Sequence, residues 1–315
     1  MKKGITTAVR TVIGVGLLFF LIKAVGLSTI IAALKQLKVT ALAVAIFLWV
    51  VGYLLGAVNI QLMFRPIKRS IPFRKTLKYY TFSWVSGMLT PARLGQLLLV
   101  FFLKKEGFKN GQAIVIQVID RAITLLAVML LSYLGLFLFF TKEQAVPIVI
   151  LSAVLFISGC AILTWEPTRR ILKGYILRRH ATAFRGFSEA LKAYTTAYPI
   201  LVLNFVITIT KTTMNALFIA VLFLGLNTRV NVVDIIVLYA VVTIISLLPL
   251  SINGLGLKEA SAVYLFSMIG VDKGIAASTF ILVTIINYMC TAAFYFYFIS
   301  RKKESGQSNK VVSNS

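Results

Sequence analysis

The chain has 315 residues, of which 59% are hydrophobic and only 13% are charged, yet its formal net charge is +24. This composition excludes an ordinary soluble domain, in which about a quarter of the residues are charged. It also excludes a soluble catalytic domain on a single anchor, because the longest polar stretch, residues 166–198, is shorter than a typical domain. Repeated apolar runs predict an all-α polytopic membrane protein.

The basic residues are concentrated in short loops between apolar runs, which favours a membrane protein over a nucleic-acid-binding protein. Cys160 and Cys290 both lie in apolar runs, where we expect them to pack as small hydrophobic side chains. The residue pattern predicts no metal site, no cofactor and no nucleotide-binding loop.

Six apolar runs are long enough to be full spans, since one crossing needs about 20 residues. They lie at about residues 5–26, 39–64, 110–140, 145–165, 199–226 and 271–299. Two further apolar regions, 76–104 and 231–268, are interrupted at Thr90-Pro91 and at Pro249. The first is too short for two crossings at about 1.5 Å per residue. Each could be one interrupted span or a re-entrant hairpin of two half-length helices.

The distribution of Lys and Arg favours two re-entrant hairpins. If both interrupted regions enter and leave on the same side, one face holds 23 of the 33 basic residues and the other face holds five. The loops on the basic face are residues 1–10, 65–78, 104–109, 166–198 and 301–315. The positive-inside rule then places both termini in the cytoplasm, and we expect a multi-pass protein of the cell membrane.

The two interrupted regions also resemble each other. A shift of 163 residues aligns Gly107-Phe-Lys-Asn-Gly-Gln-Ala with Gly270-Val-Asp-Lys-Gly-Ile-Ala, and Gly95-Gln96 with Lys258-Glu259. Within one transmembrane domain of residues 1–300, repeat one would cover about 39–140 and repeat two about 199–299. Because the first begins outside and the second inside, the repeats would be inverted, as in many transporters.

Two polar segments lie outside the repeats. Residues 166–198 interleave basic and apolar residues, which predicts a cytoplasmic amphipathic helix on the inner leaflet, with His180 in contact with solvent. Residues 301–315 are short and polar, and we expect them to form a disordered cytoplasmic tail.

Charged residues inside the apolar regions are the candidate functional residues, because a charge in hydrocarbon is costly unless paired or hydrated. Cations outnumber acids there, which predicts a cavity for an anionic group such as a phosphate. The candidate substrate-binding residues are Arg93, Lys211, Lys258, Asn253 and Arg121. The candidates for charge balance or for a coupling proton are Glu259, Asp120 and Gln96. The hairpin backbone would depend on Pro91, Gly95, Pro249, Gly254 and Gly256.

Structural roles stay open for the same residues. Arg93 could pair with Asp120 instead of binding a lipid phosphate, and Lys258 could neutralise Glu259. Asp120 and Arg121 could instead snorkel toward the cytoplasmic side. Interior amides are candidates for helix–helix hydrogen bonds, namely Asn59, Gln61, Gln117, Asn204, Asn215 and Asn287.

The motifs Pro91-Ala-Arg93-Leu-Gly95-Gln96 and Gly254-Leu-Gly256-Leu-Lys258-Glu259, with Asp120-Arg121 between them, resemble a known family. The chain is similar, over nearly its whole length, to the flippase-like membrane domain of the lysylphosphatidylglycerol synthase family, of the multiple peptide resistance factor type. The resemblance implies lipid flipping and a link to antibiotic resistance. The family commonly has Glu where this chain has Gln96, which puts in doubt a mechanism that needs paired acids in the two repeats.

We therefore expect a lipid flippase that moves a polar- or anionic-headgroup lipid between leaflets. The lipid would be a phospholipid or a polyprenyl-phosphate carrier. One alternative is lysyl transfer from lysyl-tRNA to phosphatidylglycerol, which longer relatives perform with a cytoplasmic transferase that we expect to be missing here. Another is a non-transporting partner subunit of a cytoplasmic lipid-modifying enzyme. The sequence also leaves a homo-oligomer open.

Overall fold

The computed structural model describes residues 27–90, 93–164, 186–248 and 250–312, together with the isolated residues 19 and 23. The regular elements in these ranges are helices, which confirms the all-α prediction. Five of them are long and apolar enough to cross a membrane: α3 (Val39–Leu62), α6 (Asn110–Phe139), α7 (Lys142–Thr164), α10 (Tyr198–Gly225) and α13 (Lys273–Val312). The expected first span at 5–26 lies outside the described residues except at 19 and 23, and the short helix α2 (Leu27–Lys35) follows it.

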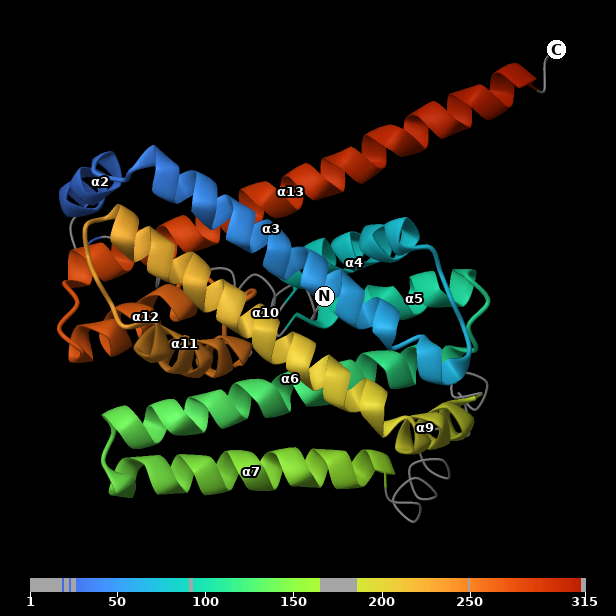
Figure 1. The fold of residues 1–315 in the computed structure, drawn as a ribbon, viewed down its shortest axis with the longest axis horizontal. Coiled ribbons are helices and arrows are strands. Elements are labelled where there is room, and N and C mark those ends of the chain that lie inside the picture. Colours follow the sequence, from blue (N-terminus) through green and yellow to red (C-terminus); the bar gives the residue numbers. More distant parts are fainter. Residues whose placement is uncertain are drawn as a thin grey trace, which may run out of the picture.

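The long helices differ in how much of their surface the protein covers. Half of the most apolar window of α13 is buried inside the protein, whereas in α7 only 6% of that window is buried. Figure 1 shows α7 along one edge of the molecule, beside α6. A helix that is apolar all round and uncovered by protein is suited to contact with lipid.

Each interrupted apolar region forms two short helices that pack against each other. Hairpin one (residues 73–105) contains α4 (Phe73–Met88) and α5 (Leu98–Lys105), with the 3₁₀ turn η2 (Leu94–Leu97) at its tip. Hairpin two (residues 232–268) contains α11 (Val232–Leu247) and α12 (Leu257–Met268). In Figure 1 the two hairpins lie on opposite sides of the molecule, with their tips toward its centre. Pro91 and Pro249 lie outside the described residues.

The two halves of the chain have the same order of elements, which is a long helix, a hairpin and a second long helix. In the first half, α5 ends at Lys105 and α6 begins at Asn110. In the second half, α12 ends at Met268 and α13 begins at Lys273, so both boundaries are displaced by the 163 residues found in the sequence. The helices α3 and α10 lie side by side and run in opposite directions (Figure 1).

The repeated glycines before α6 and α13 end the preceding short helices in the same way. Gly107 has φ 84° and Gly270 has φ 85°, a left-handed conformation that costs glycine little. The next amide then donates back to the helix, from Phe108 to the Leu103 carbonyl at 3.2 Å and from Val271 to the Phe266 carbonyl at 3.1 Å. This is the C-terminal capping arrangement for which glycine is preferred.

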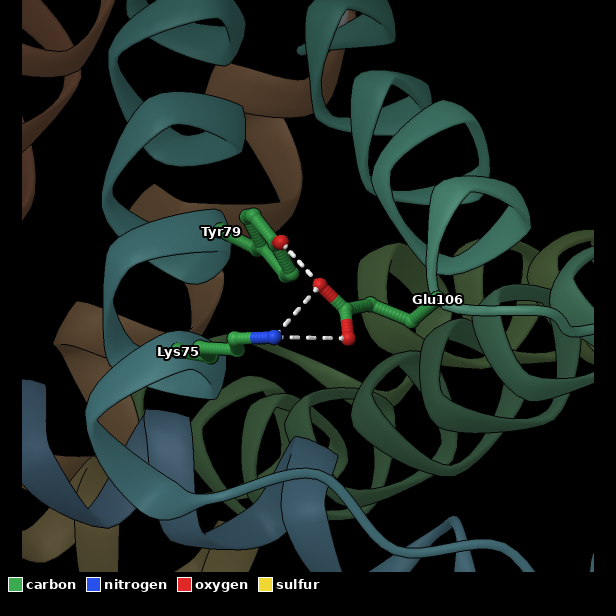
Figure 2. A network of polar contacts seen from close by, with 3 residues as sticks. All are labelled: Lys75, Tyr79 and Glu106. Atoms are coloured by element: carbon green, nitrogen blue, oxygen red, sulfur yellow. Dashed lines mark hydrogen bonds and ion pairs between the residues drawn. The ribbon is translucent and has the colours of Figure 1, made fainter. Parts of the chain in front are cut away.

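Polar contacts join the two helices of hairpin one at the end opposite its tip. Lys75 Nζ lies 3.1 Å from Glu106 Oε2, and the Tyr79 hydroxyl donates to Glu106 Oε1 (Figure 2). The hydrogen bond from Tyr79, together with Lys75, lowers the pKa of the Glu106 carboxyl. These contacts hold α4 against the turn that follows α5.

Of the two polar segments outside the repeats, the C-terminal tail differs from its prediction, and the segment at 166–198 is described only in part. In place of the expected disordered tail at 301–315, α13 continues to Val312, because the span runs directly into proline-free sequence that begins with the good helix formers Arg301-Lys-Lys-Glu304. Residues 165–185 of the expected amphipathic segment, including His180, lie outside the described residues. The segment that follows forms α9 (Phe187–Thr196), which packs against α6.

Candidate functional site

The tips of the two hairpins meet through a side-chain hydrogen bond. Arg93 Nε donates to Asn253 Oδ1 at 3.0 Å, and Asn253 Nδ2 donates to the Tyr288 hydroxyl of α13 at 3.4 Å. Arg93 has φ 56° and Asn253 has φ 53°, which is uncommon for residues other than glycine. Such backbone conformations persist where the surrounding structure holds them, and they are concentrated at functional sites.

A cavity of about 120 Å³ lies beside this contact, with walls from α3, α4, α6, α10, α11 and α13. Its charged lining residues are Arg93, Arg121 and Lys211, and none of its described lining residues is acidic. Its aromatic lining residues are Trp49, Tyr53, Tyr80, Trp84 and Tyr239. At about 30 Å³ per water molecule, the space suits a few waters or one phosphate-sized group rather than a whole lipid headgroup.

Two of the cations near the cavity lie over aromatic faces. The Arg93 guanidinium is 5.5 Å from the centre of a Trp84 ring. Lys258 Nζ is 5.6 Å from the centre of the Tyr239 ring, which itself lines the cavity. Such contacts offset part of the cost of burying a positive charge.

Asp120 is buried, and among the residues that the structure describes it forms no ion pair with an arginine. Its Oδ1 accepts hydrogen bonds from Asn59 Nδ2 and from Asn204 Nδ2, each at 3.3 Å. Asn59 Nδ2 also lies 3.2 Å from Thr208 Oγ1. The carboxylate of α6 is therefore held by amides from α3 and α10, the helix–helix role expected for these two asparagines, rather than by Arg93.

Glu259 is 1% exposed, and its side chain helps to hold the backbone at the tip of hairpin two. Its Oε2 accepts from the Gly256 amide at 2.7 Å, which caps the start of α12, and its Oε1 accepts from the Thr284 hydroxyl of α13. Among the residues that the structure describes, no ion pair joins it to Lys258. The arrangement therefore differs from mutual neutralisation of the adjacent Lys and Glu.

Gln96, the counterpart of Glu259 in hairpin one, is 5% exposed and lines a second, smaller pocket. Gln117, Ser83, Trp84 and Arg121 line this pocket with it. Within the described part of the chain, Gln96 Oε1 has no hydrogen-bond partner. Because Trp84 and Arg121 line both spaces, the small pocket adjoins the cavity.

The hairpin tips need glycine for close packing. A Cβ on Gly95 would lie 2.1 Å from the Ser86 carbonyl oxygen, and a Cβ on Gly254 would lie 2.7 Å from Ser246 Cβ. Gly254 and Gly256 also have positive φ values of 75° and 77°. These contacts give the physical reason for glycine at the three described positions that the sequence analysis singled out.

The aromatic wall is the part of the cavity that the charge-based sequence analysis missed. Trp49 and Tyr53 lie one turn apart in the middle of α3, and their rings stack with centres 4.9 Å apart. Tryptophan and tyrosine in spans usually lie at the membrane interface, so their central position is the signal that could have identified them. In the described part of the chain, no group of three or more His, Cys, Asp or Glu side chains could hold a metal ion.

The fold and this cavity define a multi-pass α-helical membrane protein whose two helical hairpins meet at a cationic, aromatic-lined space. Residues 7–294 match the family model described as the lysylphosphatidylglycerol synthase TM region. The chain therefore belongs to this family, which confirms the resemblance found in its motifs, and it is a membrane protein of lipid metabolism. No curated protein matches the chain.

Proposed function

We propose that the protein is a flippase that moves a lipid with an anionic headgroup between the leaflets of the cell membrane. The observation that carries the proposal is the cavity between the hairpin tips, which Arg93, Arg121 and Lys211 line without an acidic residue among the described lining. Guanidinium groups match the geometry of phosphate oxygens, and charge-assisted hydrogen bonds are stronger than neutral ones. The aromatic wall would pack against the carbon atoms of the headgroup.

In this proposal both hairpins are re-entrant, both termini are cytoplasmic and the two halves form inverted repeats. The excess of basic residues on one set of loops supports the orientation. The matching order of elements and the 163-residue displacement support the repeats. Inverted repeats around a central site allow one half to rock against the other, so that the site opens to each side in turn.

The cavity is smaller than a complete lipid headgroup requires. About 120 Å³ accommodates a phosphate group, whereas binding sites for larger molecules are usually about 300 Å³ or more. Passage of a complete headgroup therefore requires the hairpin tips to separate. The hydrogen bond between Arg93 and Asn253 would then break and form again in each cycle.

Leaflet exchange in liposomes tests the proposal. The purified full chain is reconstituted with fluorescent phosphatidylglycerol, and an impermeant reductant reports how fast inner-leaflet lipid reaches the outside. We expect transfer to be faster than in protein-free vesicles and to fall about tenfold or more in Arg93→Ala, because the phosphate loses a buried charge-assisted contact. Lys142→Ala, on the lipid-facing helix α7, is the matched control. Equal rates with and without protein, in the presence or absence of a pH gradient, would refute flipping of this lipid.

A further inference from the structure

The repeat relation connects two pairs of residues near the cavity. At the 163-residue displacement, Gln96 corresponds to Glu259 and Arg121 corresponds to Thr284. In the second half the pair is in contact, since the Thr284 hydroxyl donates to the Glu259 carboxylate. In the first half Gln96 and Arg121 line the same small pocket, and a neutral amide takes the place of the carboxylate.

Arg121 therefore has a neutral neighbour where the equivalent position of the other half has an acid. Arg121 also lines the central cavity, whereas Gln96 does not. The two ion pairs among the described residues, Lys75 with Glu106 and Lys109 with Glu189, involve none of the lining residues of the cavity. The positive charge of Arg121 thus acts on whatever enters the cavity.

Asp120 is close enough to act electrostatically on Lys211, but the buried acids nearby are not part of the cavity lining. Asp120 accepts hydrogen bonds from two asparagines, and Glu259 accepts from a backbone amide and a hydroxyl. Neither acid lines the cavity. An ammonium group that entered would meet like charges, without a carboxylate from the described lining.

Two of the five aromatic residues in the cavity wall already face a cation. Cations are attracted to aromatic faces, but Arg93 already lies over Trp84 and Lys258 already lies over Tyr239. A further cation at either ring would have to approach a positive charge already there. With three cations and no acid among its described lining residues, the cavity favours a phosphodiester over an amine.

We propose that the cavity selects headgroups of net negative charge, such as unmodified phosphatidylglycerol, over aminoacylated phosphatidylglycerol. Gln96 sets this preference because it leaves the described lining of the small pocket that it shares with Arg121 without a carboxylate. The inference rests on the proposed function, because it requires a lipid headgroup to enter the cavity. A carboxylate at position 96 would lie in the pocket shared with Arg121 and offset its charge. Gln96 is thus a specificity-determining residue that acts through Arg121.

Competitive binding measures the selectivity without requiring transport. The full chain in detergent binds a spin-labelled phosphatidylglycerol, which quenches the fluorescence of Trp49 and Trp84 in the cavity wall. Dioctanoyl phosphatidylglycerol, dioctanoyl lysylphosphatidylglycerol and inorganic phosphate then compete with it. The inorganic phosphate arm distinguishes recognition of a lipid from recognition of a free anion.

We expect unmodified phosphatidylglycerol to compete at a concentration about tenfold lower than the lysyl lipid, since one uncompensated charge a few ångströms away has an effect of at least this size. Gln96→Glu should reduce this ratio to near one, and Arg121→Gln should reduce it without placing a new buried acid. Gln144→Glu, the same change on the exposed start of α7, should leave it unchanged.

Equal or stronger competition by the lysyl lipid in the wild type would overturn the inference, as would a ratio unaffected by both variants of the cavity. If inorganic phosphate competed as strongly as the lipid, the cavity would be a site for free anions and not a lipid site. Selective binding without leaflet transfer would refute the flippase proposal but not the selectivity. Equal binding of the two lipids together with efficient leaflet transfer would refute the selectivity but not the flippase proposal.

Discussion

Arg93 Nε donates a 3.0 Å hydrogen bond to Asn253 Oδ1, so the tips of two hairpins 160 residues apart in the chain are in direct contact. Both residues have a left-handed backbone conformation, and Arg93 also lines the cavity. The same arginine therefore connects the two halves of the protein and contributes a positive charge to the cavity lining. A ligand phosphate would compete with Asn253 for this guanidinium.

The contact between the hairpin tips should be measurable as a coupling energy. We expect Arg93→Ala and Asn253→Ala to be non-additive by about 1–2 kcal/mol in unfolding experiments, the range for a hydrogen bond to a charged group. Arg93→Lys should not restore the coupling, because lysine lacks the planar group that presents Nε. A double-mutant cycle in mixed micelles measures this, and coupling below about 0.3 kcal/mol would show that the tips are independent.

Close packing at the tip of hairpin one predicts a severe effect of a single methyl group. Gly95→Ala places a Cβ 2.1 Å from a backbone oxygen, so we expect a loss of about 3 kcal/mol or failure to fold. Gly159→Ala is the control, because nothing lies within 4 Å of its added Cβ, and α7 should become slightly more stable. Thermal unfolding of both variants checks this. Equal stability of the two would contradict the geometry at the tip.

The carboxylate of Asp120 is the acceptor for two buried amides. Asp120→Ala should destabilise the protein by about 2–4 kcal/mol, because Asn59 and Asn204 would lose their shared partner inside the protein. Glu143→Ala, at the exposed start of α7, should change the stability by less than about 0.5 kcal/mol. Equilibrium unfolding in mixed micelles measures both. A small effect at Asp120 would mean that water replaces the carboxylate readily.

The contacts of Glu106 predict a modest dependence of stability on pH. Because the folded state lowers the pKa of this carboxyl, its stabilising effect is present above the pKa of the unfolded chain and is lost as the pH falls through the folded pKa. Lys75 is largely exposed, so we expect the effect to stay below about 1 kcal/mol. The fall in melting temperature between pH 7 and pH 3.5 should be smaller in Glu106→Gln. An unchanged fall would contradict the assignment.

Much of the fold could be predicted because the bilayer sets the length of an apolar span. The helices α3 and α6 begin at Val39 and Asn110, where the sequence placed spans two and three. Helices α4 and α11 end at Met88 and Leu247, directly before the predicted interruptions at Thr90-Pro91 and Pro249. The helical tail after residue 300 was not predicted, because composition alone does not show that a helix will continue from its span.

The contacts of the charged residues could not be predicted, although the residues themselves could. Counting charges left ion pairs open as one alternative, whereas Asp120 accepts from amides and Glu259 accepts from a backbone amide and a hydroxyl. Which partner a buried charge finds depends on which helix faces meet, and apolar periodicity does not fix this in a membrane protein, where both lipid and protein faces are apolar. The aromatic wall of the cavity was missed for the same reason.

Lys211 provides the most direct test of the central claim, that a lipid headgroup passes through the cationic cavity. It lies in the middle of α10 and lines the cavity, and among the described residues no carboxylate forms an ion pair with it. The decisive measurement is the initial rate of phosphatidylglycerol transfer in liposomes for Lys211→Ala against the control Lys142→Ala, at the exposed start of α7. We predict a rate reduced about tenfold or more in Lys211→Ala, with the fold intact by thermal unfolding, and a wild-type rate in the control. Equal transfer rates in the two folded variants would contradict passage through this cavity.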